Sequence, residues 1–212
     1  MGVSRFQRGG DGHANREMRI RSEETVSVSP RNTDDAPFAC ITLALGWDPS
    51  PESVAPAVDP VEAVENRIDV NLAALLFSGG QLVDVVFYDN LVSQDGAVRH
   101  TGDNLTGEGR GDNEMIVADL TLIDPAVTAV FVVVTSYTAT PFTEIANAYC
   151  RVTDAESMAE LGRFTLTGGP HTAVVLGRLD RTPEGWNFVG IGAGIAATHV
   201  TESIPYLTPY LP

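Results

Sequence analysis

The sequence predicts an all-β fold, a two-sheet β-sandwich with one or two short helices and long acidic loops that could bind metal. Short runs rich in β-branched and aromatic residues recur along the chain, which is typical of strands. Glycine, proline and asparagine separate these runs, and apolar and polar residues alternate clearly in 172–180 and 185–192. Hydrophobic residues make up 43% of the 212 residues, which is enough to fill a core between two sheets.

The chain divides into three parts. Residues 1–37 are polar, contain several glycines and arginines, and are expected to form a mostly flexible arm with one short strand at 24–29. Residues 38–200 form the predicted sandwich domain. Residues 201–212 include three prolines, which a central strand does not tolerate, so this tail is expected to run extended over the surface.

Nine strands are expected within the domain, together with two hairpin turns. The loop 49–66 is rich in proline and acid and contains one expected helical turn at 60–66, and 141–148 is the best candidate for a short helix. Tight turns at 78–80 ("SGG") and 183–185 ("PEG") join neighbouring strands. The strands are expected at 38–48, 69–77, 81–88, 115–120, 127–137, 147–153, 162–166, 172–180 and 185–192.

The charges exclude several classes of function. There are 28 acids against 13 bases, and every base is arginine. Without lysine the chain can form neither a Walker A loop nor a lysine Schiff base. The net charge of −15 argues against nucleic acid as a partner. An acidic body attracts cations or basic partners, although solubility alone would also explain the charge.

Neither a membrane span nor a redox centre is expected. The chain contains no run of 18 apolar residues and no apolar signal region near its start, so a cytoplasmic location without membrane insertion is expected. Cys40 and Cys150 lie in apolar runs and are expected to be free thiols. No cysteine and histidine grouping indicates zinc.

The segment 89–114 is unusual because 26 residues with little apolar content separate the strands predicted at 81–88 and 115–120. A loop of this length is usually functional or disordered. Its carboxylates, neutral oxygens and glycines suit a hard divalent cation, and an irregular glycine-rich loop suits calcium better than magnesium. The spacing is not that of an EF-hand, and a solvated acidic loop is the alternative. His100 is expected to hydrogen-bond the loop backbone.

The amino-acid sequence of the loop and of the strands around it resembles that of a known family. "IDVNLAALLF", "VVFYDNLVSQDGAVRHTGDNLTGEGRGDNEMIVADL", "VFVVVTSY", "NAYCRVTDAESMAELGRF" and "WNFVGIGAG" occur in the order found in the TerD family of bacterial tellurium-resistance and general-stress proteins. The resemblance spans about residues 38–195 and is most specific at 87–114. It implies a β-sandwich that binds calcium, commonly two ions, through acidic loops.

The resemblance implies a set of metal ligands on two segments, with departures that weaken one site. Asn71 and Asn113 stand where the family has acids, and Arg110 adds a cation. One competent calcium site and one doubtful site are therefore expected. The candidate ligands are Asp69, Asn71, Asp89, Asn90, Asp103, Asn104, Glu108, Asp112 and Glu114.

The functional expectation is a non-enzymatic, calcium-responsive interaction module of the stress response. The resemblance implies partners among other TerD-like proteins and membrane-associated stress proteins. Two alternatives stay open. The first is a metal-dependent hydrolase in which His100 acts as the base. The second is a metal-free scaffold, in which Arg110 would pair with Asp112 or Glu108.

Overall fold

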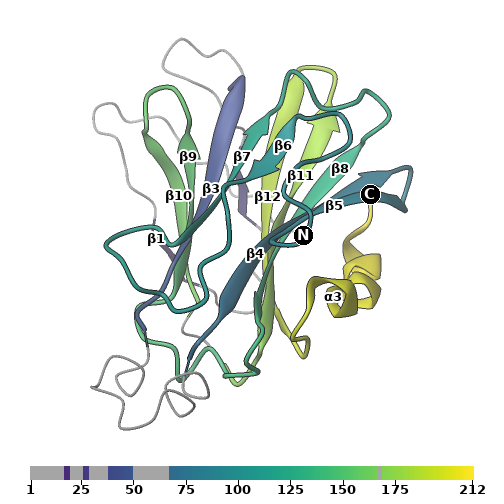
Figure 1. Ribbon diagram of the computed structural model, residues 1–212. Helices are drawn as coiled ribbons and strands as arrows, with labels where there is room; N and C mark the ends of the chain where they lie inside the picture. The colour runs from purple at the N-terminus through teal and green to yellow at the C-terminus, as the bar shows by residue number, and fades with distance from the viewer. Residues whose placement is uncertain (1–16, 20–25, 29–37, 50–66, 167–168) are drawn as a thin grey trace, which may run out of the picture.

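Two β-sheets pack face to face in the computed structural model, which describes residues 17–19, 26–28, 38–49, 67–166 and 169–212 (Figure 1). Sheet A has the strand order β1-β10-β9-β3-β7-β6 and sheet B the order β2-β12-β11-β8-β4-β5. Neighbouring strands are antiparallel, except that β1 and β10 are parallel. The all-β sandwich predicted from the sequence is confirmed.

The strands lie close to the predicted ranges. Both predicted hairpin turns are present, between β4 and β5 and between β11 and β12. The strands are β1 (Glu17–Arg19), β2 (Val26–Val28), β3 (Cys40–Gly46), β4 (Val70–Ser78), β5 (Gln81–Val86), β6 (Val98–His100), β7 (Glu114–Asp119), β8 (Ala129–Ser136), β9 (Tyr149–Asp154), β10 (Glu160–Thr165), β11 (Ala173–Thr182) and β12 (Gly185–Ile195). The helical turn expected at 60–66 and most of the arm lie outside the described residues.

The main core fills the space between the sheets, and sheet B is buried on both faces. In β4, Leu72 and Leu76 point into the main core, whereas Leu75 and Phe77 point to the outer face of sheet B. That outer face is covered by the C-terminal residues, including Leu207, which is fully buried. Burial on both faces explains why β4 and β8 are continuous apolar runs rather than alternating ones.

The prediction of an extended tail is wrong, because residues 200–210 are helical. Helix α3 spans Val200–Leu207, beside sheet B in Figure 1, and a 3₁₀ helix follows at Thr208–Tyr210. A capping box between His199 and Glu202 starts α3, and an apolar stripe docks it onto sheet B. These contributions outweigh Pro205, which removes one hydrogen bond from a short helix. No helix in the described part of the chain is long and apolar enough to cross a bilayer.

Two further local expectations need correction. Residues 141–148 form successive turns rather than a helix, and Phe142 and Ile145 are buried there as anchors. Residues 98–100 form strand β6 inside the segment predicted to be one long loop. Only His100 and Val98 of this strand are buried, so its alternation is too short to stand out in the sequence. Cys40 and Cys150 are free thiols, as expected.

Candidate metal centre

The first half of the 89–114 segment is held by hydrogen bonds of the protein itself. Phe87 and Asn90 exchange two backbone hydrogen bonds of 3.0 Å. The Ser93 and His100 N–H groups donate to the Val98 and Leu91 carbonyls at 2.9 and 2.8 Å. Residues 87–100 therefore form a closed turn that pairs with β7 through β6.

Glu114 joins this loop to the opposite sheet. Its side chain is completely buried, and its Oε2 accepts a hydrogen bond of 2.8 Å from the Leu72 N–H of β4. Its Oε1 accepts one of 3.2 Å from the Asn104 N–H. Burial raises the pKa of Glu114, while the hydrogen bonds from His100, Leu72 and Asn104 act in the opposite direction.

His100 supplies a third hydrogen-bond donor to Glu114. The Gly102 N–H donates to His100 Nδ1 at 3.1 Å, so the neutral ring carries its proton on Nε2. That Nε2 lies 3.3 Å from Glu114 Oε2 and is placed to donate to it. His100 thus hydrogen-bonds the loop backbone as expected, and both ring nitrogens are occupied.

Asp69 and Asn71 form the polar start of β4. They are buried, 9% and 4% exposed, and Asn71 Nδ2 donates to Asp69 Oδ1 at 2.7 Å. Asn71 Oδ1 is also buried but accepts no hydrogen bond from any described residue. Burial raises the pKa of Asp69 to about 6, and the charge of Asp103 adds to this effect. A carboxylate and an unsatisfied amide oxygen side by side are oxygens of the type that calcium binds.

Asp89 and Asp103 lie on the solvent side of this pair. Both are exposed. The pKa of Tyr88 is raised by burial first and by Tyr137 second, and the charges of Asp69, Asp89 and Asp103 act in the same direction. These three carboxylates therefore all act on the same aromatic side chain. No three acids, histidines or cysteines among the described residues stand close enough to enclose an ion by themselves.

Asn90 lies apart from this group. Its Nδ2 donates to the Val85 carbonyl at 2.6 Å and lies 3.5 Å from Asp84 Oδ1. The side chain therefore caps the exposed edge of β5. These contacts engage the amide nitrogen of Asn90 at the strand edge and leave its predicted role as a ligand a prediction.

The second half of the loop is closed by two asparagine amides. Asn113 Nδ2 donates to the Gly107 carbonyl at 3.0 Å and lies 3.4 Å from the Glu108 carbonyl. Asn104 Nδ2 donates to the Glu108 carbonyl at 3.2 Å. Gly107 has a φ of +73°, and a Cβ there would come within 2.5 Å of the Trp47 indole nitrogen. The side-chain amides of Asn104 and Asn113 thus donate to backbone carbonyls that would otherwise be available to a cation.

Asp112 is held by strand β9 rather than by the loop. It accepts hydrogen bonds of 3.0 and 2.5 Å from Arg151 and one of 3.0 Å from the Tyr149 hydroxyl. Among the described residues Arg110 forms no ion pair, so the pairing with Asp112 or Glu108 that would support a metal-free scaffold is not found. The sequence reasoning missed Arg151, although it points to the same face of β9 as Tyr149, two residues earlier.

The structure thus separates the predicted ligands into groups. Asp69 is hydrogen-bonded to Asn71 and is affected by the charge of Asp103, and Asp89 acts with both acids on Tyr88. Glu114 is hydrogen-bonded to the backbone of Leu72 and Asn104. Asn90 caps β5, Asp112 pairs with Arg151, and Glu108 is exposed. The first group offers oxygens of the type that calcium binds, namely carboxylates and a buried amide oxygen that lacks a donor. In the 104–113 loop, asparagine amides donate to the Gly107 and Glu108 carbonyls and Arg151 donates to Asp112, so fewer oxygens are free for a cation.

The comparisons with known proteins agree with this architecture. The TerD domain matches residues 24–201. The chain belongs to the TerD family. It is 34% identical to tellurium resistance protein TerZ of Serratia marcescens over 171 residues, which cover 80% of this chain and 86% of TerZ. It is 29% identical to stress response protein SCP2 of Bacillus subtilis, over 77% of this chain and 87% of that protein.

Solved structures share the fold of this TerD-family protein. A homologue of telluride resistance protein TerD from Streptomyces coelicolor superposes with a TM-score of 0.65 at 20% identity. The match covers 79% of this chain and 95% of that protein. At this identity the likeness shows the sandwich fold and not the activity.

Proposed function

We propose that this TerD-family protein binds one calcium ion at the start of β4 and acts as a non-enzymatic interaction module of the stress response. The residues that would hold the ion are Asp69, Asn71 and Asp103, with Asp89 at the solvent side. The carrying observation is Asn71 Oδ1, a buried oxygen without a hydrogen-bond donor beside a buried carboxylate.

The charges of the group support a divalent ion. Asp69 and Asp103 repel each other, and burial makes the charged form of Asp69 costly. A bound calcium ion would supply two positive charges and accept the free lone pairs of these oxygens. Because only the folded protein presents the group, binding stabilises the fold by about 2.7 kcal/mol when the free ion exceeds its Kd one hundredfold.

Two observations favour a binding role over a catalytic one. His100, the base that a hydrolase would require, is buried and both of its nitrogens are engaged. Cys150 is fully buried and its pKa is raised to about 12 by burial, so it is a poor nucleophile for redox work on an oxyanion. We infer that a partner protein binds the exposed part of the loop. The family relationship suggests other TerD-like or membrane-associated stress proteins as partners.

The proposal is tested by calorimetric titration of calcium into chelator-treated protein. We expect one ion per chain, and Asp69→Asn should weaken binding at least about tenfold because it removes one of the few charged ligands. Glu108→Gln is the matched control, since it removes an exposed acid of the same loop outside the group, and its affinity should equal that of the wild type. Absence of heat and of thermal stabilisation at millimolar calcium would contradict the proposal.

A further inference from the structure

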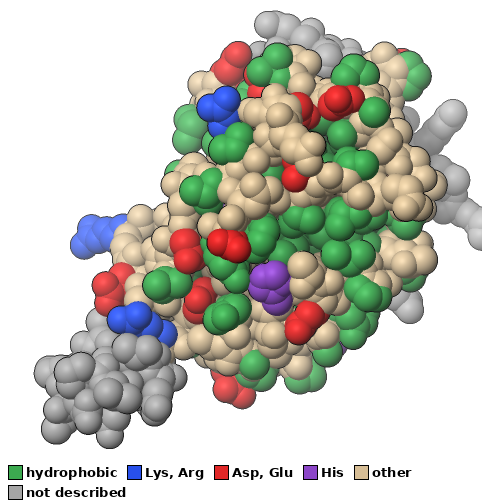
Figure 2. Space-filling model, turned by 45° about the vertical axis from the view of Figure 1, so that its right-hand side comes forward, with side chains coloured by type: hydrophobic (Ala, Val, Ile, Leu, Met, Phe, Trp, Pro, Cys, Tyr) green, Lys and Arg blue, Asp and Glu red, His purple; other side chains and the backbone are tan. Residues whose placement is uncertain are grey.

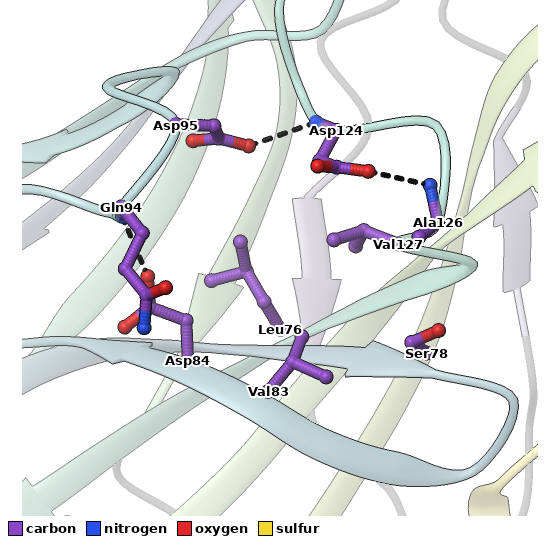
Figure 3. Close-up of a pocket in the computed structure, with 9 residues that line it drawn as sticks. All are labelled: Leu76, Ser78, Val83, Asp84, Gln94, Asp95, Asp124, Ala126 and Val127. Atoms are coloured by element: carbon purple, nitrogen blue, oxygen red, sulfur yellow. Dashed lines mark hydrogen bonds between the residues drawn. The ribbon is translucent and has the colours of Figure 1, made fainter.

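A pocket of about 220 Å³ opens at the side of the sandwich (Figure 3), and none of its lining residues belongs to the proposed calcium group. It lies between the edge strand β5 and the two turns at 93–96 and 124–127. Pockets for drug-sized ligands usually measure about 300–1,000 Å³. The pocket is therefore of a size for one long side chain.

The floor of the pocket is apolar. Leu76 and Val127 line it and belong to the main core, whereas Val83 is 45% exposed at the mouth. Val83 is the extra residue at the bulge between β4 and β5, where the pairing passes from Asp84 to Leu82. The bulge lets the surface open directly onto core side chains.

The rim of the pocket is acidic. Asp84, Asp95 and Asp124 surround the floor, and each accepts a backbone hydrogen bond that orients its carboxylate, from Gln94 at 2.7 Å, Asp124 at 2.8 Å and Ala126 at 2.7 Å respectively (Figure 3). None of the three forms an ion pair with a residue that the structure describes. The nearby Arg181 donates to the carbonyl oxygens of Ile123, Asp124 and Val127 and stacks on Trp186 at 4.3 Å. Its charge interacts with that of Asp124, but the two side chains form no ion pair.

The spacing of the rim selects the type of cation. No three acids of the described chain stand close enough to enclose a metal ion by themselves, and the rim lacks a buried, unsatisfied amide oxygen like that of Asn71. A guanidinium group is larger, delocalised and planar, and its five N–H donors can reach carboxylates that stand apart. Its methylene stem can pack on an apolar floor while the charged head stays at the rim. Apolar floor and acidic rim together match an arginine side chain.

We propose that this edge pocket docks a single arginine side chain presented by a basic segment of a partner protein. The charge of the chain favours such a partner, since its formal net charge is −15. Acidic side chains also outnumber basic ones on the face seen in Figure 2. The proposal deepens the interaction role proposed above and rests on it for its biological meaning, but the pocket shares no residue with the calcium group.

The test is a titration of the full chain with N-acetyl-arginine amide, followed by ¹⁵N NMR in the presence of a chelator. We expect the amide signals of Gln94, Asp124 and Ala126 to shift saturably, with a dissociation constant in the millimolar range for this small probe. N-acetyl-citrulline amide has the same shape without the charge and should leave these signals unchanged. Asp124→Asn keeps the turn acceptor and should weaken arginine binding about two- to fivefold.

Controls separate this inference from its alternatives. Glu144→Gln removes one exposed charge from the turn beyond β8 and should not change the affinity. Equal binding of citrulline, absence of pocket shifts, or the same shifts with calcium chloride in excess of the chelator would overturn the arginine site. The probe could also bind only after Arg5, Arg8 and Arg16 are changed to glutamine. That result would mean that the chain's own arginines occupy the pocket, and it would overturn the proposal of a separate partner. The chelator makes each result independent of the calcium titration.

Discussion

Replacing Glu114 by glutamine should destabilise the protein far more than its isosteric shape suggests. The Glu114 carboxylate is surrounded by donors only: the Leu72 and Asn104 N–H groups and His100 Nε2. A glutamine has one oxygen and one NH₂, so its NH₂ must face at least one of these donors. His100 cannot relieve the conflict by changing tautomer, because a proton on Nδ1 would then face the Gly102 N–H.

The magnitude follows from the hydrogen bonds that the substitution removes. Hydrogen bonds to a charged group contribute about 1.5–3 kcal/mol each, and an unsatisfied buried donor costs about 1–3 kcal/mol. Loss of one such bond and creation of one donor–donor contact give about 3–5 kcal/mol. For a domain of this size, that corresponds to a melting temperature about 6–20 °C lower.

The assay is urea unfolding in a chelator, followed by the fluorescence of Trp47 and Trp186, which are both buried. Glu108→Gln is the control, because the side chain of Glu108 is exposed and its change should alter stability by less than about 0.5 kcal/mol. A Glu114→Gln protein within about 1 kcal/mol of the wild type would refute the all-donor environment described for this carboxylate.

Three further expectations concern other parts of the molecule. Arg151→Met should cost about 2 kcal/mol in urea unfolding because it leaves Asp112 without its cation, and an unchanged midpoint would show that this ion pair contributes nothing. Leu207→Asp should detach α3, lower the melting temperature and increase binding of an apolar dye; a stable variant that binds no dye would mean that α3 does not seal sheet B. Cys150 should resist a thiol reagent at pH 8 until the protein unfolds, because burial raises its pKa to about 12, whereas the partly exposed Cys40 should react first; early modification of Cys150 would contradict the packing.

The strands could be predicted because their signal is local. Runs such as those of β8 and β11 carry β-branched residues, and the tight turns at 78–80 and 183–185 mark their ends. The C-terminal helix could not be predicted in this way because prolines dominate the local pattern. Its stability comes from a capping box and from burial of Leu207 against the outer face of sheet B. The local sequence does not show that this face of the sheet is available for packing.

The candidate site shows the same division. The acids and amides of the loop are visible in the sequence, but which of them converge depends on pairing between distant strands. Asp112 meets Arg151 because β3 lies between β7 and β9, and Glu114 meets Leu72 because β7 faces β4 across the core. The contacts of the Asn113 amide also depend on the folded loop. The sequence therefore predicts a weakened second site but does not show that the Asn113 amide donates to a carbonyl of the loop.

The number of calcium ions retained per chain tests most directly whether one ion binds beside Asp69 and Asn71 while the 104–113 loop is closed by its own amides. Native mass spectrometry during a calcium titration measures this number. We predict saturation at one ion, with Asp69→Asn requiring at least about tenfold more calcium to reach the same occupancy. Saturation at two ions, or an unchanged calcium requirement of Asp69→Asn, would contradict the proposed site.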